Sequence, residues 1–239
     1  MTDVTSNRKD FRRRCDDGAM PLRAVLFDFS GTLFRLEEDD SWFAGMSVAG
    51  GPVDEHVQAE LMERLTHPTG RMAGMSEQAY RAWLDRDLAP SLHREAYLHV
   101  LRESGLPDRH ARALYDRVVD PASWTPYPDT VEVLDALRGR GVKSAVVSNI
   151  AFDLRPAFRR AGAQVDEFVL SYEVGAVKPD PRIFHAALDR LGVAAADAVM
   201  VGDSEENDGA ARAVGCDFVL VDPLPTDQRP RALIDALLG

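Results

Sequence analysis

The 239-residue sequence is poor in cysteine and has no long hydrophobic run. Its two cysteines, Cys15 and Cys216, lie too far apart to indicate a disulfide framework, and no metal-ligand spacing surrounds either. No apolar stretch approaches the length of a membrane span, and the opening residues lack the apolar core of a signal peptide. We therefore expect a cytoplasmic protein in which residues 1–20 form a flexible polar arm.

Positive charge is also scarce. The chain has 28 Lys and Arg residues against 39 Asp and Glu, which gives a formal net charge of −11. This balance argues against nucleic acid or an anionic membrane as a partner. A phosphorylated ligand would therefore have to be held by local positive groups or by a metal ion. Only three of the basic residues are lysines, namely Lys9, Lys143 and Lys178.

The hydrophobic pattern changes twice along the chain. Residues 24–27 are all apolar, as in a buried parallel strand. Apolar spacing then predicts consecutive helices over residues 53–65, 76–88, 91–105 and 107–119. From Tyr127 onward, helices alternate with strands. These helices are expected over residues 128–141, 151–162, 181–192 and 205–215, and the strands over 143–149, 167–173, 198–203 and 217–222.

This alternation predicts an α/β fold, in which a Rossmann-like parallel sheet is flanked by helices. An all-helical domain would be inserted after the first strand. We expect the α/β core to comprise residues 21–34 and 123–239, and the helical insert residues 35–122. Two hinge segments would join them, the second of which, residues 123–130, is rich in proline.

Charged and polar residues stand at or just after the predicted strand ends. They are Asp28, Ser148, Asn149, Lys178, Asp203 and Asp208. Because ligands of open α/β sheets bind beyond the carboxyl ends of the strands, we expect these side chains to converge on one site. An acid that ends a buried strand, such as Asp28, needs a compensating partner, and Asp203 offers none unless a cation lies between them.

Four segments resemble, in order, the sequence motifs of the haloacid dehalogenase (HAD) superfamily. They are "FDFSGTLF", "VVSN", "VKPDPRIF" and "VGDSEEND", and the resemblance covers residues 23–222. The helical insert resembles the α-helical C1-type cap of that superfamily. The resemblance implies a hydrolase, above all a phosphatase that acts on a small phosphorylated metabolite. Its cap would close to exclude water and to select the substrate.

The resemblance also implies the catalytic roles. Asp28 would be the nucleophile and form an aspartyl-phosphate that water then hydrolyses. Because carboxylate and phosphate are both anions, a cation must lie between them, and Mg²⁺ prefers oxygen ligands. The expected ligands are the carboxylates of Asp28 and Asp203 and the backbone carbonyl of Ser30. Asp208 would orient a metal-bound water or Lys178 from behind these ligands.

The same resemblance implies which groups bind the substrate. Lys178 would neutralise the nucleophile and the phosphate oxygens, and Ser148 would donate a hydrogen bond through its Oγ. Thr32 and Asn149 are expected to complete this substrate-binding set.

Ser30 departs from the pattern, because many phosphatases of this superfamily carry a second Asp at that position. That acid protonates the leaving oxygen and then activates water, which is typically worth about 10²–10⁴ in rate. A serine hydroxyl has no pKa near neutrality and cannot replace it.

Three explanations of Ser30 stay open. The protein is a phosphatase whose substrates need little protonation, or whose proton comes from another acid, with Glu37, Glu38, Asp39 and His56 as candidates. Alternatively, it is a metal-independent 2-haloacid dehalogenase, although such relatives usually carry an aromatic residue at this position. The third explanation is a catalytically weak regulatory protein that binds a phosphorylated ligand. Phosphonate cleavage is disfavoured, because it uses a cap lysine and residues 35–142 contain none.

Overall fold

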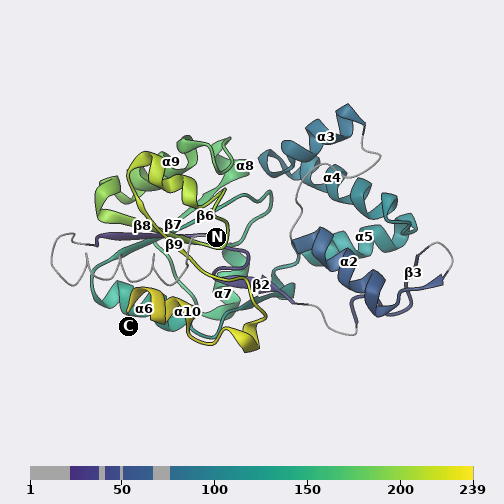
Figure 1. Ribbon diagram of the computed structural model, residues 1–239, viewed down its shortest axis with the longest axis horizontal. Coiled ribbons are helices and arrows are strands. Elements are labelled where there is room, and N and C mark those ends of the chain that lie inside the picture. The colour runs from purple at the N-terminus through teal and green to yellow at the C-terminus, as the bar shows by residue number, and fades with distance from the viewer. Residues whose placement is uncertain (1–21, 38–40, 49–50, 67–75, 239) are drawn as a thin grey trace. The chain divides into compact units, whose positions relative to one another are not determined.

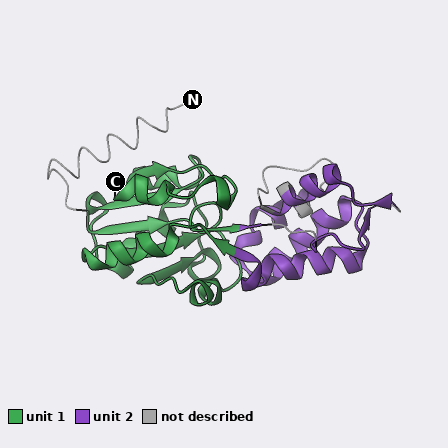
Figure 2. Ribbon diagram, turned by 90° about the horizontal axis from the view of Figure 1, so that it is seen from below, with its two compact units in different colours: residues 1–35, 125–239 green, residues 36–124 purple. Residues whose placement is uncertain are grey.

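The computed structural model describes residues 22–37, 41–48, 51–66 and 76–238 (Figure 1). The expected arm over residues 1–20 and two of the candidate acids, Glu38 and Asp39, lie outside these ranges. By its internal contacts the chain divides into two compact units (Figure 2). The first comprises the chain up to Arg35 and from Thr125 onward, and the second comprises Leu36–Trp124.

The first unit is built on a five-stranded parallel sheet with the strand order β7-β6-β1-β8-β9. The strands are β1 (Ala24–Phe27), β6 (Lys143–Ser148), β7 (Glu167–Leu170), β8 (Ala198–Gly202) and β9 (Asp217–Leu220). β1 lies in the middle, where Phe27 is opposite Val146 of β6 and Val201 of β8. All four residues of β1 are fully buried, as its purely apolar sequence predicts. The predicted α/β fold is therefore confirmed.

Helices cover both faces of this sheet (Figure 1). They are α6 (Thr130–Gly139), α7 (Arg155–Ala161), α8 (Ser171–Val174), α9 (Pro181–Leu191) and α10 (Ala232–Leu237). α9 lies on one face, and α6 packs against α10 on the other. α9 is positioned by its apolar side, because side chains that recur every three to four residues fall on one face of a helix. The buried residues of that side are Ile183, Phe184, Ala187, Leu188 and Leu191.

The strand predicted over residues 167–173 is shorter than expected. It ends at Leu170, and the chain continues into α8. The buried Oγ of Ser171 accepts a hydrogen bond from the N–H of Ile150 at 2.9 Å and donates one to the carbonyl of Ile150 at 3.0 Å. Because these bonds tie Ser171 to the segment after β6, it does not continue the strand.

Two of the predicted helices of the first unit are also shorter than expected. The helix predicted over residues 151–162 begins only at Arg155. The segment predicted as a helix over residues 205–215 contains a 3₁₀ helix over Gly209–Val214. It is shortened because a turn precedes it, in which the N–H of Asp208 donates to the carbonyl of Ser204 at 2.8 Å.

The second unit contains the helices α2 (Glu55–Thr66), α3 (Glu77–Leu84), α4 (Pro90–Glu103) and α5 (Asp108–Val119). These confirm the predicted helical insert. A short antiparallel pair, β3 (Ser47–Val48) and β4 (Gly51–Pro52), was not predicted. The large side chains of the core include Leu61, Trp83, Tyr97, Leu101 and Leu114. Where the chain passes between the units, β2 (Phe34–Leu36) pairs with β5 (Trp124–Pro126).

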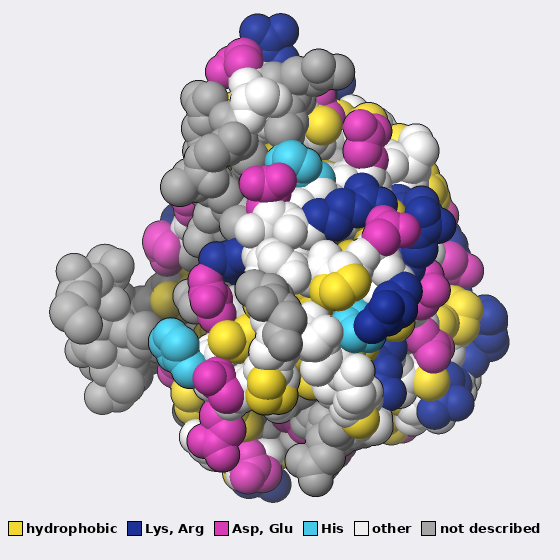
Figure 3. All heavy atoms as spheres, turned by 90° about the vertical axis from the view of Figure 1, so that its right-hand side faces the viewer, with side chains coloured by type: hydrophobic (Ala, Val, Ile, Leu, Met, Phe, Trp, Pro, Cys, Tyr) yellow, Lys and Arg dark blue, Asp and Glu magenta, His cyan; other side chains and the backbone are white. Residues whose placement is uncertain are grey.

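The described residues include no helix that combines the length and the apolar character needed to cross a bilayer. On the face of the molecule seen in Figure 3, acidic side chains lie among basic ones. The described part of this face therefore presents charge of both signs.

Candidate active site

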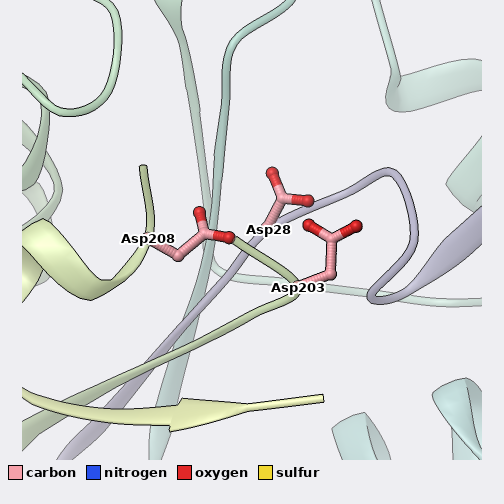
Figure 4. Close-up of side chains that lie close together, drawn as sticks. All are labelled: Asp28, Asp203 and Asp208. Atoms are coloured by element: carbon pink, nitrogen blue, oxygen red, sulfur yellow. The ribbon is translucent and has the colours of Figure 1, made fainter. Parts of the chain in front are cut away.

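The carboxyl ends of β1 and β8 bring Asp28 and Asp203 together. Asp28 follows β1 directly, and its N–H donates to the carbonyl of Val201 in β8 at 2.9 Å. Asp203 is the first residue after β8, and Asp208 follows in the turn beyond it. One carboxylate oxygen from each of the three acids lies within 4.8 Å of the other two (Figure 4). The predicted convergence of these acids is what parallel neighbouring strands require.

Two glycines allow this close approach. Gly31 has a φ of 76°, which favours glycine, and a Cβ at this position would collide with Oδ2 of Asp203. A Cβ at Gly202 would likewise collide with the carboxylate of Asp208. The loop after β1 and the end of β8 therefore pack directly against the acidic side chains.

Lys178 lies between two of the acids. Its Nζ is 2.5 Å from Oδ1 of Asp28 and 2.6 Å from Oδ1 of Asp208. Its side chain is 4% exposed, so both interactions are shielded from water. The side-chain amide of Asn149 holds the backbone of Lys178, because its Nδ2 donates to the carbonyl at 2.9 Å and its Oδ1 accepts from the N–H at 2.6 Å. Asn149 thereby places the segment that carries the ammonium group.

Asp208 is fixed through both of its carboxylate oxygens. Oδ1 accepts a hydrogen bond from Lys178, and Oδ2 accepts one from the N–H of Ser204 at 3.0 Å. The residue is almost completely buried. Both carboxylate oxygens of Asp208 therefore already have hydrogen-bond donors.

The charges at the site are unbalanced, since three carboxylates face one ammonium group. Burial raises the pKa of Asp28 to about 6, although the adjacent Lys178 acts to lower it. Burial and repulsion from Asp28 and Asp208 raise the pKa of Asp203 to about 8. Burial acts to lower the pKa of Lys178, but the carboxylates of Asp208 and Asp28 outweigh it and raise that pKa above its ordinary value. The site therefore needs further positive charge if all three acids are to be ionised.

The donor set fits Mg²⁺. Mg²⁺ takes oxygen ligands and is commonly bound by one or two carboxylates while it keeps several waters. Asp28 and Asp203 offer such oxygens, and their mutual repulsion is the electrostatic condition that a divalent cation relieves. That the backbone carbonyl of Ser30 is a further ligand stays a prediction.

Two of the predicted substrate-binding residues lie in buried positions. Ser148 ends β6 and is 3% exposed. Thr32 is fully buried in the loop after β1, and its Oγ1 has no hydrogen-bond partner among the described residues. Both assignments to the substrate-binding set stay predictions. The same holds for Asn149, whose side-chain amide is occupied by Lys178.

The segment that follows β9 also contacts the loop after Asp28, a contact that was not predicted from the sequence. Arg229 of this segment is buried and donates through its guanidinium to the carbonyls of Gly31 and Thr32. Arg229 also lies over the ring of Tyr127, 3.2 Å from its centroid. No motif or period in the sequence marks these contacts, because they join residues that are about one hundred to two hundred positions apart.

Comparison with known proteins defines the class of protein to which this chain belongs. Residues 22–215 match the family model of the haloacid dehalogenase-like hydrolases, and the chain belongs to this family. The predicted superfamily is thus confirmed, and the chain is a hydrolase.

Relatives within the family differ in activity. Haloacid dehalogenase-like hydrolase domain-containing protein 3 of Mus musculus is 33% identical over 84% of this chain and 82% of its own length. Phosphoserine phosphatase of Thermus thermophilus is 32% identical over 91% and 96% of the two chains. The solved structure of L-2-haloacid dehalogenase from Xanthobacter autotrophicus superposes with a TM-score of 0.60 at 25% identity, and covers 91% of this chain and 84% of its own. The family thus includes both a phosphatase and a dehalogenase among proteins similar to this one.

Proposed function

We propose that this hydrolase is a Mg²⁺-dependent phosphatase that acts on a small phosphorylated metabolite through Asp28. The observation that carries the proposal is the group of three carboxylates, of which Asp28 and Asp208 are buried and Asp203 is half-buried, with the ammonium of Lys178 bound to the two buried ones. This excess of negative charge suits a site that holds a divalent cation and receives a phosphate. The similarity to a phosphoserine phosphatase supports the same conclusion.

In the proposed mechanism, a carboxylate oxygen of Asp28 attacks the phosphorus atom. A P–O bond forms to Asp28, and the bond to the leaving oxygen breaks with its electron pair. Water then attacks the phosphorus of the aspartyl-phosphate, which releases inorganic phosphate and restores the carboxylate. When bound, Mg²⁺ neutralises charge on the phosphate and on the attacking carboxylate.

The surrounding residues orient and stabilise this reaction. Lys178 holds the carboxylate of Asp28 in place through Oδ1. As negative charge spreads over the phosphate oxygens, the Lys178 ammonium stabilises it, and Ser148 adds a hydrogen bond from the end of β6. Asp208 keeps the ammonium in place through its own contact at 2.6 Å.

Ser30 limits the kind of substrate that reacts well. Its hydroxyl cannot protonate a leaving alkoxide near neutral pH, so the proposed enzyme favours substrates whose leaving oxygen is a weak base. We also propose that the helical unit is a C1-type cap and selects the substrate.

Haloacid dehalogenation is the second candidate, and it rests on the similarity to L-2-haloacid dehalogenases. In that reaction, Asp28 would displace halide from carbon, and hydrolysis of the resulting ester would restore the carboxylate. Such attack on a neutral carbon does not require the charge of a divalent cation. The carboxylates of Asp28 and Asp203 lie close together and repel each other, which suits a site that binds a divalent cation, and this favours the phosphatase.

A substrate panel separates the two candidates. Phosphorylated metabolites and 2-haloacids should be assayed for phosphate and halide release, each with Mg²⁺ and with EDTA. Release of phosphate only with Mg²⁺ supports the proposal, and Asp28→Asn should abolish it while the fold is retained. Halide release in EDTA that Asp28→Asn abolishes would replace the phosphatase with the dehalogenase.

A further inference from the structure

The backbone carbonyls of the loop after Asp28 are bound by an arginine from the C-terminal segment. Nη1 of Arg229 donates to the carbonyl of Gly31 at 2.7 Å, and Nη2 donates to the carbonyl of Thr32. Nη1 also lies 3.2 Å from the carbonyl of Asp222. The two nitrogens of one planar guanidinium thus serve successive carbonyls in a fixed geometry, which a lysine ammonium, with all of its donors on one nitrogen, does not reproduce.

The loop itself leaves these two carbonyls without partners. The carbonyl of Phe29 accepts from the N–H groups of Thr32, Leu33 and Phe34, and the N–H of Gly31 donates to the carbonyl of Phe34. These bonds close the turn from within, but none of them uses the carbonyls of Gly31 and Thr32. Unpaired buried carbonyls cost free energy, so the turn depends on a donor from elsewhere in the chain.

Arg229 is itself held in a fixed place. It is 4% exposed, and its guanidinium lies over the ring of Tyr127, whose hydroxyl donates to the carbonyl of Leu224 at 2.8 Å. Just beyond Arg229, the N–H groups at the start of α10 donate to Oδ2 of Asp129. The C-terminal segment is therefore anchored on both sides of the arginine.

The loop that Arg229 holds is in contact with the reacting groups. It begins directly after Asp28, and Gly31 packs so closely against Oδ2 of Asp203 that no Cβ fits between them. A shift of the loop would move the nucleophile relative to Asp203. We infer that Arg229 is a positioning residue, which fixes the loop after Asp28 so that the nucleophile keeps its place beside Asp203. This inference rests on the proposed role of Asp28 as the nucleophile.

The test compares Arg229→Lys with Arg35→Lys. Both variants keep the positive charge and lose the planar guanidinium, but the guanidinium of Arg35 donates to the carbonyl of Pro223, which lies outside the loop. With p-nitrophenyl phosphate and Mg²⁺, Arg229→Lys should lower kcat by about tenfold or more while KM changes less than about threefold. Arg35→Lys should leave kcat within about twofold of the natural protein.

A second readout does not depend on turnover. Hydrogen exchange of the amides of Leu33 and Phe34, followed by mass spectrometry, should become faster in Arg229→Lys and stay unchanged in Arg35→Lys. Equal kcat values for the two variants, or unchanged exchange in Arg229→Lys, would overturn the inference. If Arg229→Lys does not fold, Tyr127→Phe should speed exchange of the same amides, because it releases Leu224 and loosens the segment that carries Arg229.

The proposed function and this inference can fail separately. If the natural protein hydrolyses no phosphate, the proposed function is wrong, and hydrogen exchange alone decides whether Arg229 holds the loop. If the natural protein is active and only the loop experiment fails, the phosphatase stands without this role for Arg229.

Discussion

Asn149 and Lys178 are joined by two hydrogen bonds between the side-chain amide of the first and the backbone of the second, at 2.9 and 2.6 Å. The same Lys178 reaches Asp28 and Asp208 through its ammonium group. Asn149 stands directly after β6, next to β1 in the sheet. The pairing therefore sets the position of the ammonium relative to the nucleophile through hydrogen bonds to the backbone of Lys178.

The first prediction concerns Asn149→Ala. Loss of both hydrogen bonds should displace the Lys178 ammonium and lower kcat by about tenfold or more, with little change in KM. Asn149→Asp keeps an acceptor for the N–H of Lys178, so its kcat should lie between that of the natural protein and that of Asn149→Ala. Steady-state kinetics with p-nitrophenyl phosphate measure both constants. A rise in KM at unchanged kcat would show instead that Asn149 mainly binds substrate, the role predicted from the sequence.

The second prediction concerns binding of Mg²⁺. A ligand that binds the folded state alone stabilises it, by about 2.7 kcal/mol at one hundred times its dissociation constant. Mg²⁺ should therefore raise the melting temperature of the metal-free protein, and it should raise that of Asp203→Asn far less. Asp189→Asn, which removes an exposed charge from α9, should keep the full response. Equal shifts in all three proteins, measured by differential scanning calorimetry, would mean that Asp203 does not bind the ion.

The third prediction concerns His93 in the helical unit. The residue is buried, its ring stacks on that of Tyr97 at a centroid distance of 4.3 Å, and its Nδ1 lies 3.2 Å from the hydroxyl of Tyr115. Burial, together with the charge of Arg86, lowers the pKa of His93 from 6.5 to about 3. The unfolded chain thus takes up a proton near pH 6.5 that the folded protein takes up only near pH 3. The stability that neutral His93 contributes is complete above pH 6.5 and is lost as the pH falls from 6.5 toward 3.

His93→Asn provides the measurement. Asparagine does not titrate, so the free energy of unfolding of the variant lacks this pH dependence. The stability advantage of the natural protein over His93→Asn should shrink by about 2 kcal/mol between pH 8 and pH 5 in urea unfolding experiments. A difference that stays constant with pH would contradict the lowered pKa of His93.

The strands and their ends could be predicted from the sequence because they rest on local patterns. Four apolar residues before Asp28 define β1, and a similar apolar run before Asp203 defines β8. Once the strands are parallel, their carboxyl ends share one edge, so the meeting of Asp28 with Asp203 follows from topology alone. For these two acids, no information beyond the direction and neighbourhood of the strands is needed to predict that they lie close together.

Contacts made through backbone carbonyls could not be predicted in this way. Any residue offers a carbonyl, so the sequence around Gly31 does not show that Arg229 will bind there. The same is true of Ser171, whose bonds to the backbone of Ile150 end the strand that its apolar neighbours predict. Tertiary hydrogen bonds of this kind override local propensity.

The last prediction concerns Ser30, which stands in the loop that Arg229 holds and two residues after the nucleophile. In a phosphatase without a general acid at this position, the bond to the leaving oxygen breaks without proton transfer. The rate should then fall steeply as the pKa of the leaving group rises, so an aryl phosphate should react far faster than an alkyl phosphate. Rates for a series of phosphate esters with leaving groups of graded pKa measure this slope.

Ser30→Asp should flatten that slope, because a carboxyl group two residues from Asp28 can protonate a poor leaving group and then activate water against the aspartyl-phosphate. We expect hydrolysis of alkyl phosphates to rise by about 10² or more, and that of activated aryl phosphates to change much less. Ser30→Asn is the matched control, since it has nearly the same size as Asp but transfers no proton, and it should keep the steep dependence. A shallow slope already in the natural protein would mean that another residue supplies the proton. In that case Glu37→Gln and His56→Gln should each be tested, and the one that restores a steep slope identifies the donor.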